Sequence, residues 1–359
     1  MKRVCVLSQL PPPWHGSTVM TATLVAALRT EGFDVDVVER RFSRSVDEVG
    51  RLSPRKILSA LGLTGRLAWA LGGRTRPLLV FFLTNRPFSF LVDLLLLEIA
   101  RLRRAEVVHY VHTTGFAVLA RRGRFWAWAV RRALGAARLT VVLGHSLSAD
   151  VEAFVDPKSI RIIPNAVAAG DLVVSAAPRR SVVFVSNLLP EKGADDFVEL
   201  AARFSRDVDF LLYGAPGPAG YMAELTTSIA GLTNCDYLGT LPTQEKWRVL
   251  SEASALIFPS SYPYEAQPLT IIEAMACGTP VIGYDVGAVR ELLEHAPSCV
   301  VVRQGGLDDV EGELMRLLGL GPRQKEAQRQ LLREYASEHH STSAYGRAWR
   351  RVVEEVLGG

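Results

Sequence analysis

The segment Phe258–Leu293 constrains the fold most strongly, because it carries the marks of a helix between two buried strands. The apolar run Ala255–Phe258 leads into a loop, and helix-forming residues follow Pro268, whose missing N–H is no loss in a first turn. Gly278-Thr279-Pro280 predicts the end of this helix, and Val281–Gly283 is typical of a short buried strand. A strand, a helix and a strand in this order predict an α/β fold with a parallel sheet.

Two carboxylates flank the start of the predicted helix. Glu265 lies in the loop before it and Glu273 lies about one turn inside it, with seven residues between them. The backbone N–H groups of Leu269 and Thr270 point out of the helix start, where free amides attract anions and above all phosphates. Phosphate-binding amides beside hydroxyl-binding carboxylates predict a nucleotide-sugar site. Taken alone, the two glutamates fit equally well an amphipathic helix with solvated carboxylates.

The sequence around these two glutamates favours the nucleotide-sugar site over the solvated helix. The spacing Glu265-x7-Glu273, followed by AMACGTPVIGYDVGAVREL, resembles the donor-site signature of retaining glycosyltransferases of the GT-B fold, specifically glycosyltransferase family 4 (group 1). The resemblance implies two Rossmann-like domains facing a central cleft. It also implies a C-terminal helix that crosses back to the N-terminal domain.

The length and pattern of the chain agree with two domains. At 359 residues with 48% hydrophobic side chains, the chain can bury two cores. The strand and helix pattern starts once near Arg3 and again near Ser181, after the small, polar stretch Ala168–Arg180. We predict an acceptor-binding Rossmann-like domain at residues 1–168, a donor-binding one at 169–340, and a terminal helix at 341–359 that packs on the first domain.

In the first domain, two loops attract attention. Gly16 follows the first strand, and the resemblance implies that it faces the donor phosphates and the acceptor, with His15 beside it on the acceptor side. His112 comes directly after the strand Val107–Val111, and ligands of open α/β sheets gather at such carboxyl ends. HTTGF resembles the family's histidine loop, which implies that His112 approaches the donor sugar, the acceptor and the attacked carbon. The alternative is a capping or core histidine.

In the second domain, SNLLPEKGADDFVELA is similar to the family's phosphate-binding phrase. The family usually has an arginine where Asn187 stands and a lysine five residues later, which is Lys192 here. A pair of cations would neutralise both phosphates of the leaving diphosphate, whereas Lys192 alone supplies only part of this stabilisation. Helix amides near Leu269 could supply the rest.

The resemblance therefore implies a division of roles. Glu273 binds the ribose hydroxyls, Lys192 and the helix amides hold the diphosphate, and Glu265 contacts the sugar. The residues assigned to catalysis are His112, Glu265 and Lys192. The residues assigned to donor binding are Gly16, Asn187, Lys192, Glu265, Pro268, Leu269, Thr270 and Glu273.

No cofactor or metal is predicted. Metal-dependent transferases use a DxD-type ligand pair, and the two acidic pairs here, Asp195-Asp196 and Asp308-Asp309, are predicted to be helix-start charges. The four cysteines are scattered without CxxC spacing, which predicts a reducing cytoplasm and no structural zinc.

Charge is divided unevenly along the chain. Residues 1–168 carry 24 Lys and Arg against 12 Asp and Glu, and residues 169–359 carry 17 against 25. The basic amphipathic stretches Arg41–Arg76 and Arg121–Arg138 suit an anionic membrane or a lipid-phosphate acceptor, although an ordinary helix packed on the sheet explains the first equally well. Nucleic acid is a weaker candidate, because the second half is acidic. Charges interrupt every apolar run before the roughly 18 residues of a membrane span.

These observations predict a metal-independent retaining glycosyltransferase at the inner face of the cell membrane. It would transfer a sugar from a nucleotide-diphosphate sugar to a lipid-linked glycan, in the biosynthesis of a bacterial O-antigen, lipopolysaccharide, capsule or exopolysaccharide. Two alternatives stay open: a soluble transferase that decorates a small metabolite, and a non-catalytic nucleotide-sugar-binding module, for which Asn187 is the support.

Overall fold

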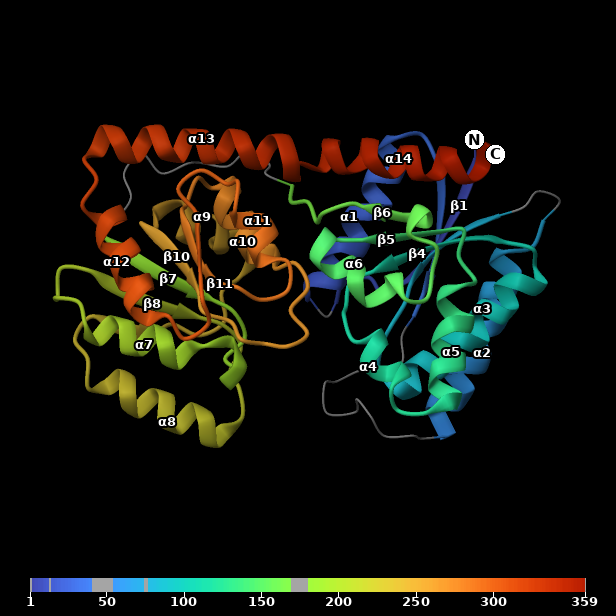
Figure 1. Cartoon of the computed structure of the whole chain (residues 1–359), viewed down its shortest axis with the longest axis horizontal. Helices are drawn as coiled ribbons and strands as arrows, with labels where there is room; N and C mark the ends of the chain where they lie inside the picture. Colours follow the sequence, from blue (N-terminus) through green and yellow to red (C-terminus); the bar gives the residue numbers. More distant parts are fainter. Residues whose placement is uncertain (1, 13, 41–53, 74–76, 169–179, 359) are drawn as a thin grey trace. The chain divides into compact units, whose positions relative to one another are not determined.

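The computed structural model describes residues 2–12, 14–40, 54–73, 77–168 and 180–358. The chain divides into two units, one made of Met1–Ala166 with Thr342–Gly359 and the other of Val167–Ser341. Each unit contains one six-stranded sheet with helices on it (Figure 1). The linker predicted at Ala168–Arg180 lies almost entirely outside the described residues, and so does the first part of the basic stretch Arg41–Arg76.

The first unit is built on a fully parallel sheet with the strand order β2-β1-β3-β4-β5-β6. Its central strands are largely apolar, with the sequences LLVFF and EVVHYV, as expected where helices cover both faces of a sheet. In the register, Val80 lies opposite Val108. The strands are β1 (Arg3–Ser8), β2 (Asp34–Glu39), β3 (Leu78–Phe82), β4 (Glu106–Val111), β5 (Leu139–Val142) and β6 (Ile160–Ile162).

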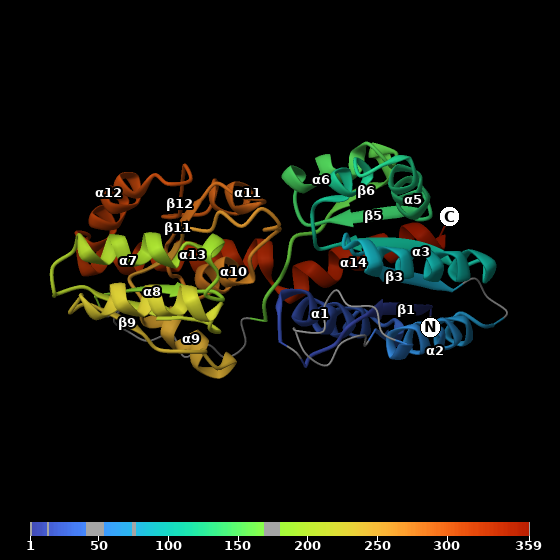
Figure 2. The same cartoon turned by 90° about the horizontal axis from the view of Figure 1, so that it is seen from below.

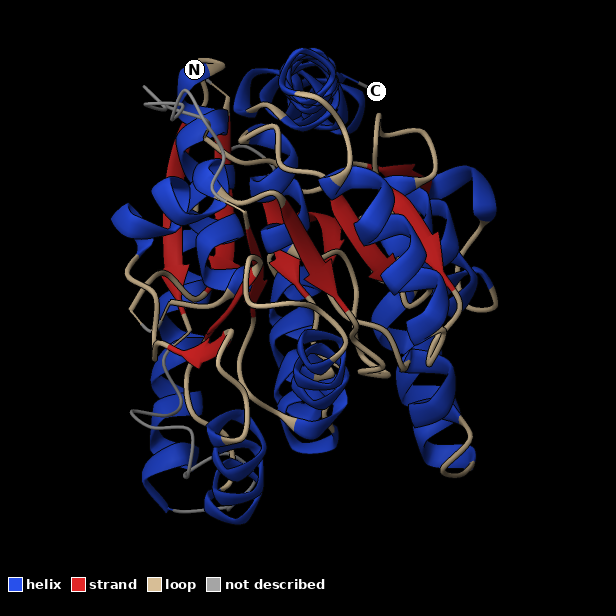
Figure 3. Ribbon diagram, turned by 90° about the vertical axis from the view of Figure 1, so that its left-hand side faces the viewer, coloured by secondary structure: helices blue, strands red, loops and turns tan. Residues whose placement is uncertain are grey.

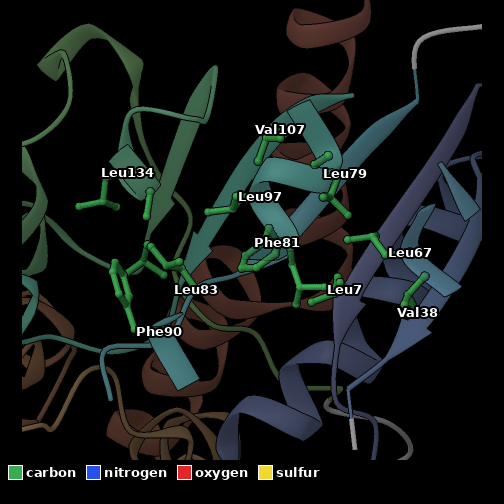
Figure 4. Close-up of a cluster of buried hydrophobic side chains, with 14 of the residues drawn as sticks. Leu7, Val38, Leu67, Leu79, Phe81, Leu83, Phe90, Leu97, Val107 and Leu134 are labelled. Carbon is green, nitrogen blue, oxygen red and sulfur yellow. The ribbon is translucent and has the colours of Figure 1, made fainter. Parts of the chain in front are cut away.

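Helices complete the first unit. They are α1 (Gly16–Thr30), α2 (Pro54–Ala70), α3 (Pro87–Leu102), α4 (Phe116–Ala120), α5 (Arg124–Leu134), α6 (His145–Glu152), the 3-10 turn η2 (Pro157–Ser159) and the terminal helix α14 (Thr342–Gly358). Leu7, Phe81 and Leu97 bring β1, β3 and α3 into one buried cluster (Figure 4). The terminal helix packs on α1 and β3 of this unit, as predicted, with Trp349 fully buried.

The second unit repeats the architecture with the strand order β12-β11-β10-β7-β8-β9, again parallel throughout. The strands are β7 (Ser181–Val185), β8 (Asp209–Tyr213), β9 (Cys235–Tyr237), β10 (Ala255–Phe258), β11 (Val281–Tyr284) and β12 (Val300–Val302). The helices are η3 (Pro190–Lys192), α7 (Ala194–Ala202), α8 (Ala219–Ala230), α9 (Thr243–Glu252), α10 (Leu269–Ala276), α11 (Val289–Leu293), α12 (Leu307–Leu318) and α13 (Pro322–His340). Helices α7 and α8 lie side by side (Figures 1 and 2), and the strands run between layers of helices (Figure 3).

The predicted helix of the second unit, α10, begins and ends close to its expected bounds. Pro268 is the residue just before the helix, with φ −68° and ψ 123°, and not part of the first turn as predicted. Gly278 follows the helix with a φ of +73°, which favours glycine, and its N–H donates to the carbonyl of Met275. The structure thus confirms the α/β fold with two Rossmann-like sheets.

Candidate functional site

All residues predicted for donor binding except Gly16 lie in the second unit, where loops leave the carboxyl ends of β7 and β10. Lys192 Nζ lies 2.5 Å from Glu265 Oε2, and Ser260 Oγ donates to the same oxygen over 3.1 Å. The ammonium also lies 4.5 Å from the centre of the Tyr262 ring, within cation–π distance. Side-chain exposure is 14% for Lys192 and 11% for Glu265, so this ion pair is largely shielded from water. Two residues that the sequence assigned to one site are therefore in contact.

Close backbone packing holds Glu265 in place. Gly287 has a φ of +54°, and a Cβ on this residue would overlap the carbonyl oxygen of Glu265. One residue later, Ala288 N–H donates to the carbonyl of Ala266 over 2.9 Å. The loop after β11 thus clamps the loop that carries Glu265, and it can do so only with glycine at position 287.

Two further glycines, Gly193 and Gly214, allow close packing at the loop after β7. Gly193 directly follows Lys192 with a φ of +78°, and a Cβ there would overlap the carbonyl of Pro259. A Cβ on Gly214 would overlap the carbonyl of Ser186, next to Asn187. Asn187 is exposed in this same loop, which supports its assignment to the donor side without testing it.

The start of α10 has no side-chain cap among the described residues. Leu269 and Thr270 are the first two helical residues and both are half-buried. Their amide N–H groups are two of the orphan donors that every helix start carries, and they suit an anion.

Glu273 lies in α10, nearly buried, and has a partner that the sequence did not reveal. Lys246 of α9 places its Nζ 2.5 Å from Glu273 Oε1. Within the described residues, Glu273 Oε2 is buried and has no hydrogen-bond partner. The motif around Glu273 contains no sign of Lys246, because the contact depends on how α9 packs against α10.

In the first unit, His112 lies just after β4 in aromatic surroundings. Its ring stacks on Phe82 with 5.2 Å between ring centres and meets the edge of Tyr110 at 4.0 Å. The residue is half-buried, but its Nε2 atom is fully buried and lacks a partner in the described part of the chain. Loss of hydration lowers the pKa of His112 to about 3. The imidazole is therefore neutral at physiological pH and can offer an N–H or a lone pair.

A carboxylate fixes the loop that follows His112. Asp150 of α6 accepts hydrogen bonds from the N–H groups of Gly115, Phe116 and Ala117, at 2.7, 2.9 and 3.0 Å. These amides form the start of α4, so an internal carboxylate neutralises this helix end. The anion-binding capacity of α4 is thus used to hold the histidine loop.

His15 and Gly16 mark the start of α1. His15 is the residue before the helix, exposed, with its Nδ1 3.1 Å from Ser17 Oγ, and its backbone N–H donates to Thr18 Oγ1 over 3.1 Å. Gly16 is the first helical residue. His15 therefore has a local structural role, and acceptor binding by either residue stays a prediction.

The acidic pairs Asp195-Asp196 and Asp308-Asp309 lie in the first turns of α7 and α12, as predicted. Over the described ranges, acidic, cysteine and histidine side chains do not gather in groups of three or more that could hold a metal ion. In the same ranges, no helix combines the length and the apolar character needed to cross a membrane.

Comparison with known proteins places the chain in a family. The family profile for glycosyl transferases group 1 matches residues 174–338, and the profile for glycosyltransferase family 4 matches residues 14–170. An α-maltose-1-phosphate synthase of Mycolicibacterium smegmatis is 28% identical over 50% of this chain and 47% of its own length. A 2-deoxystreptamine glucosyltransferase of Streptomyces kanamyceticus is 28% identical over 53% of each chain. An exopolysaccharide phosphotransferase of Streptomyces coelicolor is 28% identical over 54% of this chain and 21% of its own. The chain thus matches about half or less of the length of these relatives.

Solved structures share the whole fold at low identity. Anabaena HepE in complex with UDP and glucose is 17% identical, with a TM-score of 0.72 over 99% of this chain and 100% of that one. A sucrose-phosphate synthase of Thermosynechococcus elongatus reaches a TM-score of 0.76 at 17% identity, with all of both chains covered. The two profiles together span most of the sequence. The chain belongs to the group 1, family 4 glycosyltransferases and has the GT-B fold.

Proposed function

We propose that this protein is a retaining glycosyltransferase whose second unit binds a nucleotide-diphosphate sugar. The observation that carries this proposal is the Lys192–Glu265 ion pair in the same unit as the uncapped start of α10 and the buried Glu273. Here a cation, free amides and two carboxylates gather in one unit. They match a ligand with phosphates at one end and hydroxyls at the other.

The ion pair suggests how the donor is engaged. A diphosphate would attract Lys192 Nζ away from Glu265, and the freed carboxylate oxygen could then accept a hydrogen bond from a sugar hydroxyl. Lys192 and the amides of Leu269 and Thr270 would stabilise the charge that develops on the leaving diphosphate. Retention would follow from attack on the same face as the leaving group, with the departing phosphate as base and no protein nucleophile. We assign to His112 the catalytic contribution of the first unit, made by its neutral imidazole.

Several similarities support a nucleotide-sugar donor. HepE, which shares the fold, was solved with UDP and with UDP-glucose. The relatives include a 2-deoxystreptamine glucosyltransferase and a D-inositol 3-phosphate glycosyltransferase. UDP and its sugars are therefore the first ligands to test. A metal is not part of the proposal.

The acceptor that we propose is a glycan on a lipid carrier at the inner face of the cell membrane, in the synthesis of a bacterial surface polysaccharide. Support comes from large apolar side chains that stay exposed on three helices of the first unit. They are Leu61 and Trp69 of α2, Phe88, Leu91, Leu95 and Leu102 of α3, and Phe125 and Trp128 of α5. Exposed apolar side chains gathered on a few helices are typical of interaction surfaces.

Arginines accompany this surface on α5. Arg124, Trp128, Arg131 and Arg132 line an open hollow of about 510 Å³. Arg132 is paired with Glu98 of α3, whereas Arg124 is exposed. A tryptophan among arginines suits the headgroup region of an anionic bilayer, where aromatic rings lie at the interface and each basic side chain adds about 1 kcal/mol.

Flotation with vesicles tests the membrane part of the proposal. Wild-type protein should bind vesicles that contain phosphatidylglycerol, bind neutral vesicles weakly, and be released as salt rises. The double variant Phe125→Ser/Trp128→Ser should lose this binding. Leu331→Ser, which removes an equally exposed apolar side chain from α13, should not. Binding that ignores lipid charge and the α5 variant would rule out this surface.

A small-metabolite acceptor is the second candidate, favoured by the similarity to a 2-deoxystreptamine glucosyltransferase. A transferase of that kind would glycosylate a water-soluble acceptor without vesicles or detergent. The third candidate is a non-catalytic module, suggested by Asn187 in place of the usual arginine. If neither the wild type nor Glu265→Ala hydrolyses the donor, the result would support the non-catalytic module.

The decisive experiment has two steps. A thermal-shift panel of UDP, GDP and ADP sugars identifies the donor, because a ligand at a hundred times its dissociation constant stabilises by roughly 2.7 kcal/mol. Transfer to a polyprenyl-diphosphate-linked glycan is then followed by NMR of the anomeric proton. A product with the donor's anomeric configuration supports retention, and an inverted product rules it out.

A further inference from the structure

The second unit contains two Lys–Glu pairs, and they differ in what surrounds them. Lys192 and Glu265 meet between two loops, where a diphosphate can reach the lysine. Lys246 and Glu273 meet between two helices, α9 and α10, and the Glu273 side chain is only 8% exposed. The second pair is therefore built into packed secondary structure.

The two oxygens of Glu273 are not equivalent. Oε1 accepts a hydrogen bond from Lys246 Nζ over 2.5 Å. Oε2 is buried and, within the described ranges, has no donor. Buried polar atoms are nearly always hydrogen-bonded in folded proteins, and those that are not commonly await a ligand or a water molecule. Oε2 is an acceptor only, so the missing partner is an N–H or O–H group.

The ammonium of Lys246 also supplies a positive charge beside this carboxylate. A nearly buried carboxylate is stable in its ionised form only beside a cation or several donors. Lys246 supplies the cation at one oxygen and leaves the other oxygen unoccupied. The lysine side chain is 21% exposed and that of Glu273 is 8% exposed, so this ion pair is largely shielded from water.

We propose that Lys246 is a positioning residue for the nucleotide: it pairs with one oxygen of Glu273 and orients the carboxylate, so that Oε2 accepts a hydrogen bond from a ribose hydroxyl. This inference rests on the proposed donor site and adds a residue from α9 to it. The Lys192–Glu265 pair must open when a diphosphate binds, whereas the Lys246–Glu273 pair stays closed. Recognition of the ribose thus depends on the contact between α9 and α10.

Calorimetric titration tests the inference with nucleotides alone. Of UDP, GDP and ADP, the diphosphate that binds wild type most tightly is compared with its 2′,3′-dideoxy counterpart. Wild type should prefer the ribonucleotide about tenfold, the range of one well-made hydrogen bond to a charged group. Lys246→Met should weaken ribonucleotide binding by about the same factor and bind both nucleotides equally. Lys246→Arg should restore part of the preference.

Further variants separate positioning from loss of structure. Arg248 lies in α9 two residues after Lys246 and is paired with Glu252. Its replacement in Arg248→Met should leave the affinities for both nucleotides unchanged. Glu273→Gln should abolish the preference, and adding Lys246→Met to it should cause no further loss, because the two residues act as one unit.

The outcomes distinguish two failures. If wild type binds one of the diphosphates and Lys246→Met keeps the tenfold preference for ribose, the role of Lys246 is wrong and the donor site stands. If wild type binds none of the three at millimolar concentration, the proposed donor site fails and this inference fails with it.

Discussion

At the scale of single residues, the donor side depends on a few side chains that tertiary contacts hold in place. Lys192 and Glu265 are 73 residues apart in sequence and form an ion pair that is largely shielded from water. Gly193, directly after Lys192, packs against the carbonyl of Pro259, and Gly287 packs against the carbonyl of Glu265, in both places too closely for a side chain. The chemistry of the site and its rigidity therefore come from different residues.

Lys192→Met should reduce donor turnover strongly and leave the fold intact. If Lys192 stabilises the leaving diphosphate, its loss should lower kcat by about 10²- to 10³-fold, the range found for a single transition-state donor. Donor hydrolysis or transfer, measured beside circular dichroism, checks this. Lys158→Met, an exposed lysine of the first unit, is the control and should be fully active. Unchanged kcat in Lys192→Met would remove this residue from the catalytic set.

Gly287→Ala tests the clamp on the Glu265 loop. The new Cβ would overlap the Glu265 carbonyl at a φ of +54°, so we expect about 1–3 kcal/mol of lost stability and weaker nucleotide binding. Gly239→Ala is the matched control, because Gly239 also has a positive φ, +79°, but open space around it. The free energies of unfolding of both variants, measured by chemical denaturation, separate the effect of the overlap from that of the positive φ. A loss that is the same in both would mean that only backbone strain matters at position 287.

At the scale of elements, the starts of helices α10 and α4 have different roles. The start of α10 is left without a side-chain cap in the described structure, in the same unit as Lys192 and Glu273. The start of α4 is instead filled by Asp150, which takes three backbone donors. One helix end is thus open to an external anion, and the other is used to anchor the loop of His112.

Asp150→Asn should loosen that loop. The amide keeps the shape of the carboxylate but loses the charge that favours a helix start, so we expect about 1–2 kcal/mol of lost stability. Transfer should fall as well, because the loop after His112 is less firmly held. Thermal unfolding and a transfer assay check both parts. Asp156→Asn, which caps only the 3-10 turn η2 on the surface, should cost less and leave transfer unchanged.

At the scale of the whole molecule, two histidines with lowered pKa values connect stability to pH. His109 lies fully buried in β4, with its Nε2 2.9 Å from the carbonyl oxygen of Ala133. Burial lowers the pKa of His109 to about 4, as it lowers that of His112 to about 3. Both side chains are therefore neutral in the folded protein well below the pH at which an unfolded chain becomes protonated.

The sign of the pH effect follows from these values. Unfolded histidine has a pKa of about 6.5, so below that pH the unfolded state binds protons that the folded state does not. Their stabilising contribution is fully present above pH 6.5 and is lost as pH falls toward 4. Denaturant titrations should show the free energy of unfolding falling by on the order of 3 kcal/mol for each histidine over this range. His109→Gln should flatten the decline, whereas His295→Gln, at an exposed position, should not. A decline that His109→Gln leaves unchanged would contradict this assignment.

The sequence alone determined the fold class and the family, and it predicted most of the residues that we assign to the donor site. Hydrophobic runs, glycines and prolines are local signals, and they predicted α10, its end at Gly278 and the repeated strand–helix pattern, because each depends on neighbours in the chain. Motif resemblance added His112, Lys192, Glu265 and Glu273. Only Pro268 was assigned one position too far into its helix, which is within the usual uncertainty of helix ends.

The tertiary structure decided which of these residues meet and what surrounds them. The contact of Lys192 with Glu265, that of Lys246 with Glu273, and the aromatic surroundings of His112 each join segments that lie apart in the chain. Nothing in the local sequence encodes such contacts, because they follow from how helices and loops pack on a sheet. The residue types set the chemistry that is possible, and packing chose the partners that give each side chain its charge, its orientation and its free hydrogen-bonding atom.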